Sequence, residues 1–364
     1  MNTQEHWESY CSEELAILRP VLKRHGYTLD EQQPHLGGER YLMQAVTTTS
    51  GKKLILQGTR ADGTRVIIKA TRDEAGTREL IHEHTCREVL AKINFADSTF
   101  HTPECLAHME DTGFVITITR FIPQTITFLE RPLLEQFDFA LRAFKGQESA
   151  HATTFAHRAL IQKTFGMRTG ETYLKNFRDF LTHSRESYTD TLLMSRLEET
   201  DALLEKNERT IEQYCGFLTH TDFVPHNIRI EGKTIILLDH SSLTFGNKYE
   251  GWARFLNFMT LHNQVLERAL VAYVAKNRAR EELVALRMMR MYRLGEIIWY
   301  YIRTLPLSSD NLLTLNTARV TFWSNVLAHL LKDETVPLSL IEAYSKERNS
   351  LRSEDEKERQ KGLH

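Results

Sequence analysis

The chain has 364 residues, of which 41% are hydrophobic and 26% charged, a balance that is ordinary for a soluble globular protein large enough for two packed units. Its 46 basic and 48 acidic side chains give a formal net charge of only -2, so the composition predicts neither a nucleic-acid nor an anionic-membrane partner. The four cysteines form no C-x-x-C pair, and the sequence shows neither a secretory start nor an apolar stretch of the roughly 18 residues that span a bilayer, so we expect a reduced, cytoplasmic protein.

The first third of the chain predicts a helix followed by a small sheet. Apolar side chains first recur at helical spacing, and short β-rich runs separated by Ser50-Gly51 and Asp62-Gly63 follow. The expected elements are a helix at 4–25, strands at 41–46, 53–57 and 65–70, a helix at 78–93 and a strand at 114–121. Successive antiparallel hairpins would make a small curled sheet in the order β-β-β-α-β.

The rest of the chain changes character after Pro123. Long helical patterns run to about Gln213, a short β-rich island spans 228–238, and helical patterns continue to about Tyr344. The residues that follow are almost all charged or small, which predicts a solvated helix end or a disordered tail. We therefore expect an N-terminal helical extension, a first lobe, a helical second lobe and a charged tail, at 1–38, 39–122, 123–345 and 346–364.

The strongest chemical signal is a run of polar residues inside the second lobe. His220, Asp222 and Asn227 form the pattern H-x-D-x-x-x-x-N, and a short apolar strand downstream ends at Asp239. Phosphoryl transfer requires a carboxylate that orients the attacking hydroxyl and oxygen ligands that hold magnesium against the phosphates, and these residues are of the right kinds. The apolar runs between Asn227 and Asp239 can pair as a hairpin, which would bring Asp239 back beside Asn227.

This segment resembles the catalytic core of the aminoglycoside phosphotransferase and choline kinase group, relatives of the protein kinases that commonly show H-G-D-x-x-x-x-N followed by I-D. The resemblance implies that Asp222 is the catalytic carboxylate, that Asn227 and Asp239 bind magnesium, and that His220 braces the loop. Thr221 stands where the group usually has glycine, a departure that removes no catalytic group.

A kinase fold also requires a strand lysine that contacts the nucleotide phosphates and a helix glutamate that positions it. Lys69 ends the run Val66-Ile67-Ile68-Lys69, which resembles the V-A-I-K strand, and Glu83 opens a stretch that resembles the group's E-x-x-x-x-x-W-L. We therefore prefer Glu83 to Glu79 and Glu88 as the partner of Lys69. The alternative for Glu83 is an ordinary solvent-facing position on an amphipathic helix.

Two further segments are expected to contact the nucleotide. The loop at 47–52 would cover the phosphates through Ser50 and Gly51, but it lacks G-x-G-x-x-G and is equally compatible with an ordinary polar turn. By resemblance, the hinge that binds adenine through its backbone extends from Thr119 to Ile122. Backbone recognition leaves little trace in side-chain identity, so this assignment rests on position alone.

Two other clusters have simpler explanations. The 16 histidines show no H-E-x-x-H or comparable ligand spacing, so we predict no zinc site. The aromatic and methionine residues between Met288 and Tyr301 are most simply a helix packing face, although in the group that the chain resembles the late helices help to wall the acceptor site.

The sequence thus predicts an α+β, two-lobed protein-kinase-like fold, with a small antiparallel sheet and one helix in the first lobe and a mostly helical second lobe. The expected function is an ATP- and Mg²⁺-dependent phosphotransferase that moves the γ-phosphate to a hydroxyl of a small molecule. Gly251 stands where the group has the aspartate that ties down the catalytic loop, and with the unusual covering loop it motivates the alternative of a catalytically idle kinase-fold binding or regulatory protein. A protein kinase is a further alternative, but the sequence has no D-F-G or A-P-E motif.

Overall fold

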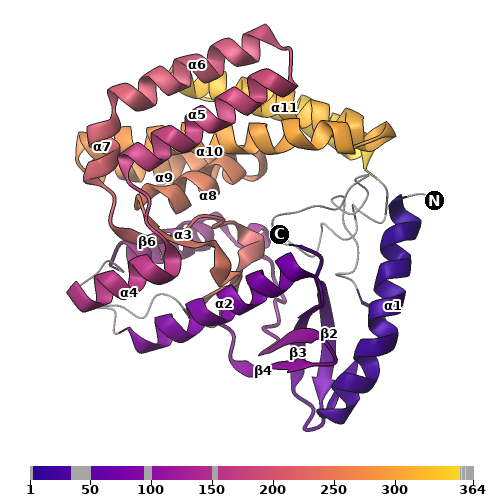
Figure 1. Ribbon diagram of the computed structural model, residues 1–364. Coiled ribbons are helices and arrows are strands. Elements are labelled where there is room, and N and C mark those ends of the chain that lie inside the picture. The colour runs from indigo at the N-terminus through magenta and orange to yellow at the C-terminus, as the bar shows by residue number, and fades with distance from the viewer. Residues whose placement is uncertain are drawn as a thin grey trace.

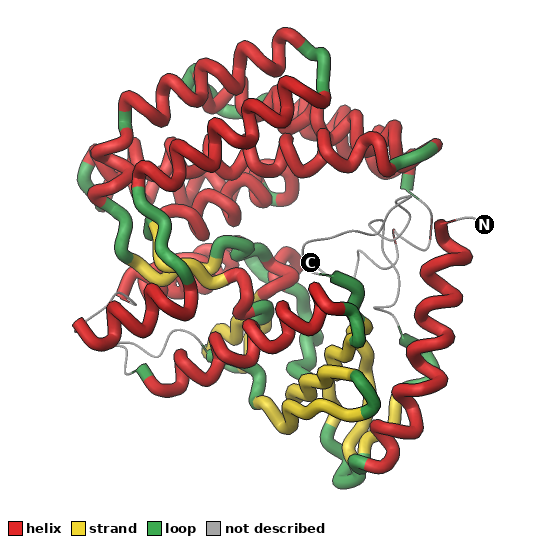
Figure 2. The backbone as a smooth tube through the Cα atoms, viewed as in Figure 1, coloured by secondary structure: helices red, strands yellow, loops and turns green. Residues whose placement is uncertain are grey.

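The computed structural model of the protein describes residues 3–33, 51–93, 101–149 and 155–352, together with 354 and 357. Within these ranges the chain forms a smaller lobe built on an antiparallel sheet and a larger lobe made mostly of helices (Figure 1). Figure 2 shows the strands gathered in the smaller lobe and at the junction between the lobes. This is the α+β, two-lobed, protein-kinase-like architecture that the sequence predicts. None of the described helices is long and apolar enough to cross a membrane.

The smaller lobe is a sheet with a helix on each face. Among the described residues the sheet has five strands in the order β1-β2-β3-β5-β4, and all neighbours are antiparallel. The elements are α1 (Thr3–Arg24), β1 (Tyr27–Leu29), β2 (Leu54–Arg60), β3 (Arg65–Thr71), α2 (Glu74–Lys92), β4 (Cys105–Asp111) and β5 (Phe114–Arg120).

The alternation of side chains along β3 gives its two faces different surroundings. Val66, Ile68 and Ala70 are fully buried in the core of this lobe, together with Leu22 of α1. Because successive side chains of a strand point to opposite faces, Lys69 lies on the other face, where α2 packs (Figure 1). The strand pattern therefore directs one charged side chain toward the junction of the two lobes.

The described strands differ from the predicted ones at both edges of the sheet. The sequence does not predict β1, which is only three residues long and lies within the expected helical extension 1–38, yet it pairs with β2. It does not predict β4 either, because this edge strand stays half-buried and lacks a regular alternation. The strand expected at 41–46 lies outside the described residues.

The start of α2 also differs from the prediction. The helix begins at Glu74, earlier than the expected Arg78, because Asp73 caps it. The Asp73 carboxylate accepts a hydrogen bond from the backbone N–H of Gly76 at 2.9 Å, which satisfies a donor that the first helical turn leaves open. The cap fixes this end of the helix that carries Glu83.

The larger lobe is a stack of helices around a continuous apolar core (Figure 1). The helices are α3 (Leu133–Ser149), α4 (Phe155–Phe165), α5 (Gly170–Ser187), α6 (Thr191–Lys206), α7 (Glu208–Gln213), α8 (Tyr249–His262), α9 (Gln264–Asn277), α10 (Arg280–Thr304), α11 (Asp310–Leu331) and α12 (Leu338–Leu351). The last helix continues beyond the predicted lobe end at 345, so the first residues of the expected tail 346–364 are helical.

Two short antiparallel strand pairs interrupt the helices. The predicted β-rich island is β7 (Ile228–Glu231) paired with β8 (Thr234–Leu237). A second pair, β6 (Phe217–His220) with β9 (Leu243–Gly246), brackets it. These strands are four residues each, too short for a clear periodic pattern, and the sequence does not predict β6 or β9. Together the two pairs frame the segment that carries the polar motif.

Candidate active site

The loop that carries Asp222 and Asn227 connects β6 to β7. Its first end is fixed by the β6–β9 ladder and its second end by the β7–β8 hairpin. The backbone N–H of Leu238 donates to the carbonyl oxygen of Asn227 at 2.9 Å, and Asp239 is the next residue after this bond. The hairpin predicted from the sequence is therefore present, and it returns Asp239 to the loop.

Asp222 is held by two neighbouring side chains. Arg254 of α8 donates from Nε to Asp222 Oδ1 at 2.8 Å, and Asn227 donates from Nδ2 to Asp222 Oδ2 at 2.9 Å. Burial alone would raise the pKa of Asp222, but the positive charge of Arg254 and the other basic groups nearby together outweigh it and hold the pKa well below its usual range. A third of the Asp222 side chain (33%) stays exposed, so an ionised and oriented carboxylate faces solvent.

Asn227 and Asp239 present oxygen atoms of the kind that magnesium prefers. The Asn227 amide also donates to the carbonyl oxygen of Asp222 at 2.9 Å, and none of the described residues donates to its Oδ1. Asp239 has a left-handed backbone, with a φ of 56°, and its carboxylate accepts the hydroxyls of Ser241 at 2.7 Å and Ser242 at 3.1 Å. Each carboxylate oxygen keeps further acceptor capacity. This donor set fits a magnesium ion that completes its shell with phosphates and water.

Histidine, cysteine and carboxylate side chains do not gather as a metal-binding cluster within the described ranges. No group of three or more histidine, cysteine, aspartate or glutamate side chains there is arranged to hold a metal ion. A cation at Asn227 and Asp239 would therefore depend on ligands that a substrate brings, as magnesium in nucleotide sites commonly does.

The two residues before Asp222 anchor the loop. His220 is fully buried, and its Nε2 lies 2.8 Å from the carbonyl oxygen of Leu238. Thr221 donates both its backbone N–H and its hydroxyl to the carbonyl oxygen of Ser242, at 2.9 and 2.8 Å. The threonine that replaces the usual glycine therefore adds a side-chain hydrogen bond to the loop.

A residue that sequence reasoning missed, Gln147 of α3, ties the loop from the other side. The backbone N–H of His220 donates to Gln147 Oε1 at 2.9 Å. Gly251 leaves no room for a side chain here, because a Cβ would lie 2.9 Å from the carbonyl oxygen of His220. Glu250, the neighbouring carboxylate, is fully buried and accepts the hydroxyl of Tyr173 at 2.6 Å instead. No local sequence pattern marks Gln147, which reaches the loop from 73 positions away.

Lys69 and Glu83 form an ion pair between β3 and α2. Lys69 Nζ lies 2.7 Å from Glu83 Oε2, and Arg87 donates to the other carboxylate oxygen at 2.7 Å. Glu83 is only 2% exposed, so it does not occupy a solvent-facing position. Burial raises the pKa of Glu83, but the charges of Lys69 and Arg87 outweigh it and hold the pKa well below its usual range. Glu79 and Glu88 pair with other residues.

His240 is the residue directly after Asp239. It opens a short 3-10 turn, His240–Ser242, that contacts α2, and it is fully buried. Burial, together with the positive charge of Arg87, holds the pKa of His240 well below its usual range. A neutral imidazole therefore lies where the smaller lobe meets the Asp239 segment.

The residues expected to contact the nucleotide base and phosphates are only partly placed. Ser50 lies outside the described residues. Gly51 has a φ of +65° and packs against the first turn of α2, where a Cβ would lie 2.1 Å from the backbone nitrogen of Gly76. Thr119 lies within β5, in register with strands on both sides. Ile122 follows β5 and is buried, and no described residue forms a hydrogen bond with its backbone N–H or C=O.

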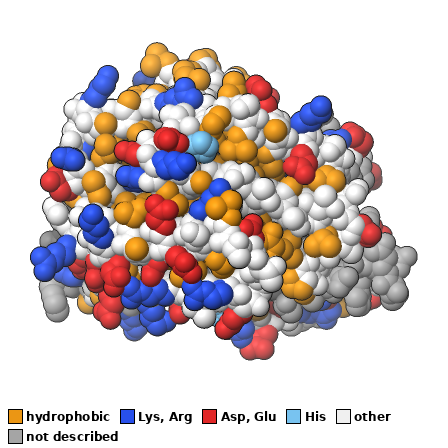
Figure 3. Space-filling model, turned by 90° about the horizontal axis from the view of Figure 1, so that it is seen from above, with side chains coloured by type: hydrophobic (Ala, Val, Ile, Leu, Met, Phe, Trp, Pro, Cys, Tyr) orange, Lys and Arg blue, Asp and Glu red, His pale blue; other side chains and the backbone are white. Residues whose placement is uncertain are grey.

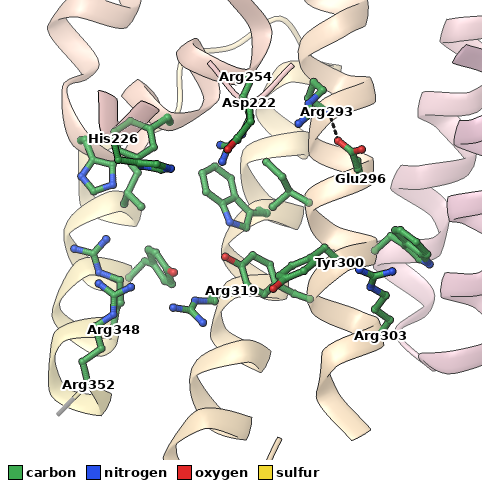
Figure 4. A pocket seen from close by; sticks show the side chains of 18 residues that line it. Asp222, His226, Arg254, Arg293, Glu296, Tyr300, Arg303, Arg319, Arg348 and Arg352 are labelled. Carbon is green, nitrogen blue, oxygen red and sulfur yellow. Dashed lines mark hydrogen bonds and ion pairs between the residues drawn. The ribbon is translucent and has the colours of Figure 1, made fainter. Parts of the chain in front are cut away.

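A cavity of about 660 Å³ opens beside Asp222 in the larger lobe (Figure 4). Helices α8, α10, α11 and α12 supply most of its wall. The aromatic and methionine cluster of α10 divides here, because Met288, Met289 and Tyr292 are buried, whereas Tyr300 and Tyr301 line the cavity. The predicted packing face is thus present in the first part of the helix, and Tyr301 in its last turns packs against the core as well as lining the cavity.

Sequence reasoning also missed Arg254, the partner of Asp222. It lies three positions after Gly251, on the same helix, α8. A charged side chain that close to Gly251 is the only signal that the sequence offers.

Comparison with known proteins shows which fold this is. No protein-family profile and no curated protein sequence matches the chain. Among solved structures, it is similar to a type I macrolide 2'-phosphotransferase (TM-score 0.56, 12% identity, covering 85% of this chain and 97% of that one). It is also similar to the macrolide 2'-phosphotransferase MphH from Brachybacterium faecium (TM-score 0.53, 16% identity, 84% and 97% covered).

A third similar structure is a thermostable mutant of aminoglycoside phosphotransferase APH(4)-Ia in a ternary complex with ADP and hygromycin B (TM-score 0.52, 14% identity, 78% and 92% covered). The identities are low, whereas the coverage extends over nearly the whole of each related chain. The chain is thus a divergent example of the two-lobed, protein-kinase-like fold of the aminoglycoside and macrolide phosphotransferases.

Proposed function

We propose that this protein is an ATP- and magnesium-dependent phosphotransferase that moves the γ-phosphate to a hydroxyl group of a small molecule. The observation that carries the proposal is the Lys69–Glu83 ion pair, at 2.7 Å, facing the lobe that holds Asp222, Asn227 and Asp239. Phosphoryl transfer requires these two halves together, and each was predicted from a separate part of the sequence. In this proposal 39–122 binds the nucleotide, and 123–345 supplies the catalytic loop and the acceptor site.

The low pKa of Asp222 defines what this carboxylate would do. An ionised aspartate with a depressed pKa is a weak base, so its main role is to accept a hydrogen bond from the acceptor hydroxyl and orient it. The acceptor oxygen then bonds to the γ-phosphorus while the bond from that phosphorus to the bridging oxygen of ADP breaks. The hydroxyl proton passes to Asp222 late in the reaction and then to solvent.

The remaining residues would position the nucleotide. Asn227 Oδ1 and the Asp239 carboxylate would hold magnesium, which supplies positive charge against the phosphates. Lys69, fixed by Glu83, would contact the phosphates. Ile122 would offer its backbone groups to adenine, with Thr119 at the start of the hinge, and Ser50 and Gly51 would belong to the covering segment.

The similar solved structures support a nucleotide as the phosphate donor and a small molecule as the phosphate acceptor. Related structures contain ADP or AMP-PNP together with hygromycin B, a small molecule. No nucleic-acid or membrane partner enters the proposal, which also keeps the cytoplasmic location expected from the composition.

Both alternatives lose specific support. The alternative of an idle protein is based partly on Gly251, because the aspartate expected at that position would hold the catalytic loop. Here Gln147 holds that loop by accepting a hydrogen bond from the backbone N–H of His220. The protein-kinase alternative needs an activation segment after Asp239, whereas the 3-10 turn, β9 and α8 follow one another closely there.

The test compares the wild-type protein with Lys69→Ala in binding of a fluorescent ATP analogue with and without magnesium. Consumption of ATP is then measured with a panel of hydroxyl compounds. We expect magnesium-dependent binding that weakens in Lys69→Ala, together with magnesium-dependent ATP consumption that rises with at least one acceptor. Nucleotide binding without ATP consumption would favour the idle protein, and absence of nucleotide binding would overturn both readings.

A further inference from the structure

The catalytic loop supplies no lysine or arginine of its own for the group that is transferred. None lies between His220 and Asn227. In a kinase fold the strand lysine, here Lys69, pairs with the α- and β-phosphates. The outer surface does not supply this charge either, because acidic and basic side chains are interspersed on the face of the larger lobe in Figure 3. A side-chain cation for the γ-phosphate would therefore come from the wall of the cavity beside Asp222.

Arg254 of α8 is the basic side chain that contacts Asp222. Its Nε donates to Asp222 Oδ1 at 2.8 Å, and within the described part of the chain no residue accepts a hydrogen bond from its Nη1 or Nη2. The Arg254 side chain is 19% exposed and lines the cavity. Figure 4 shows it beside Asp222 at one end of that cavity. One edge of the guanidinium is thus fixed by the carboxylate, and its two terminal nitrogens keep their donor groups for a ligand.

The second arginine near this end of the cavity is already matched by carboxylates. Arg293 Nη1 lies 2.5 Å from Glu296 Oε2 and 3.4 Å from an oxygen of the buried Glu250. Among the described residues Arg254 has an ion pair with Asp222 only. Arg254 is therefore the arginine at this end of the cavity that has donor capacity for a further anion.

The position of Asp222 determines what the terminal nitrogens of Arg254 can reach. A hydroxyl that donates to Asp222 carries the oxygen that attacks the γ-phosphorus, so the phosphoryl group meets the acceptor directly beside this carboxylate. Nε, Nη1 and Nη2 share one planar guanidinium, whose fork matches the spacing of phosphate oxygens. A guanidinium that is held through Nε can therefore present Nη1 and Nη2 to the oxygens of the phosphoryl group.

We propose that Arg254 is a further catalytic residue, which binds the γ-phosphoryl group through Nη1 and Nη2 and stabilises its charge during transfer. This inference rests on the proposed function. The acceptor oxygen bonds to the γ-phosphorus, the bond from that phosphorus to the bridging oxygen of ADP breaks, and the hydroxyl proton passes to Asp222. Arg254 keeps its protons throughout, because a guanidinium does not deprotonate in proteins. Its bond to Asp222 holds the donors in place before the charge develops.

The test measures binding of a mimic of the phosphoryl group in transfer. Aluminium fluoride is added with ADP, magnesium and the acceptor that the hydroxyl panel identifies. We expect the mimic to tighten ADP binding to the wild-type protein, and Arg254→Gln to lose at least about tenfold of that tightening. The affinity of Arg254→Gln for ADP alone should stay within about twofold of wild type, since Arg254 does not contact ADP. Wild-type tightening in Arg254→Gln would overturn the inference.

Two variants separate contact with the phosphoryl group from an effect through Asp222. Asp222→Asn keeps an oxygen that can accept from Arg254 Nε, so the mimic should tighten ADP binding more in this variant than in Arg254→Gln. Equal losses in the two would mean that Arg254 only positions Asp222, and the inference would be wrong. Arg268→Gln removes the same charge from an exposed position on α9 outside the cavity and should behave as wild type.

Arg254→Lys keeps the charge but not the fork, so it should retain only part of the tightening. This variant decides alone if Arg254→Gln does not fold, and full tightening in it would then overturn the inference. In steady-state kinetics Arg254→Gln should lower kcat by about 10²- to 10³-fold, the usual cost of removing a donor to transition-state charge. Rates are compared above the acid limb of both proteins, where Asp222 is ionised in each, and an unchanged kcat there would contradict the catalytic role.

The outcomes separate this inference from the proposed function. If the wild-type protein binds no ADP, the phosphotransferase proposal fails and the role of Arg254 fails with it. If ADP binds and phosphate is transferred, but aluminium fluoride does not tighten ADP binding or tightens it equally without Arg254, only the role of Arg254 is wrong.

Discussion

Replacing Glu83 by glutamine tests whether a buried carboxylate braces the smaller lobe. Glu83 is 2% exposed and lies 2.7 Å from both Lys69 and Arg87, so Glu83→Gln leaves two cations facing a neutral amide. Removing one partner of a buried ion pair costs about 3–5 kcal/mol. Lys69 is 19% exposed and can regain some hydration, so we expect the lower end, about 3 kcal/mol, and weaker nucleotide binding.

The matched control is the same substitution one turn further along the same helix. The Glu88 side chain is 55% exposed and its only described ion pair is with His84 at 3.6 Å, so Glu88→Gln should change the free energy of unfolding by about 0.5 kcal/mol or less. Urea unfolding followed by far-ultraviolet circular dichroism measures both variants. If Glu83→Gln and Glu88→Gln lower the free energy of unfolding by amounts that agree within about 0.5 kcal/mol, the usual range for surface substitutions, the argument that burial makes the Glu83 pair strong is refuted.

The pH dependence of the stability difference between wild type and Glu83→Gln gives a second check. The folded-state pKa of Glu83 is depressed, so its contribution is present above the pKa of an unfolded glutamate, about 4.3, and is lost as the pH falls toward the folded value. The stability gap between wild type and Glu83→Gln should therefore shrink in acid. A gap that widens below about pH 4.3 would contradict the sign of this shift.

Two further changes test the catalytic loop. Gly251→Ala should destabilise the protein, because the new Cβ would lie 2.8 Å from Thr219 Oγ1 and 2.9 Å from the carbonyl oxygen of His220. Overpacking costs about 1–3 kcal/mol against a helix-propensity gain of about 1 kcal/mol, and a higher urea midpoint would show that the loop has room. Arg254→Gln should raise the pKa of Asp222 and move the acid limb of the kcat/KM profile to higher pH, since the Arg254 charge lowers that pKa. An acid limb that stays in place would mean that Arg254 does not control the Asp222 carboxylate.

The parts that sequence reasoning captured are those in which a local pattern dictates the geometry. Alternation along β3 directs Lys69 to the face opposite α1, and helical spacing on α2 brings Glu83 to it. The apolar runs after Asn227 pair as predicted and return Asp239 to the loop. In each case the partners are close in sequence or lie on adjacent elements of a sheet and helix.

The parts that it missed depend on contacts between distant elements. Gln147 reaches His220 from α3, and Arg254 reaches Asp222 from α8, and neither contact leaves a periodic signal. The cavity beside Asp222 is lined mostly by residues of four helices, so no single stretch of the sequence marks it. The edge strands β1 and β4 escaped for a related reason, since one is very short and the other is only half-buried.

The most direct test of the proposed chemistry is Asp222→Asn, measured for phosphoryl transfer from ATP to the best acceptor and, separately, for nucleotide binding. Loss of an acid–base group typically costs 10²- to 10⁴-fold in rate, and the asparagine retains the shape of the side chain. We predict transfer reduced by at least about 10²-fold with nucleotide affinity largely unchanged. Transfer at the wild-type rate in Asp222→Asn would contradict the assignment of Asp222 as the catalytic carboxylate.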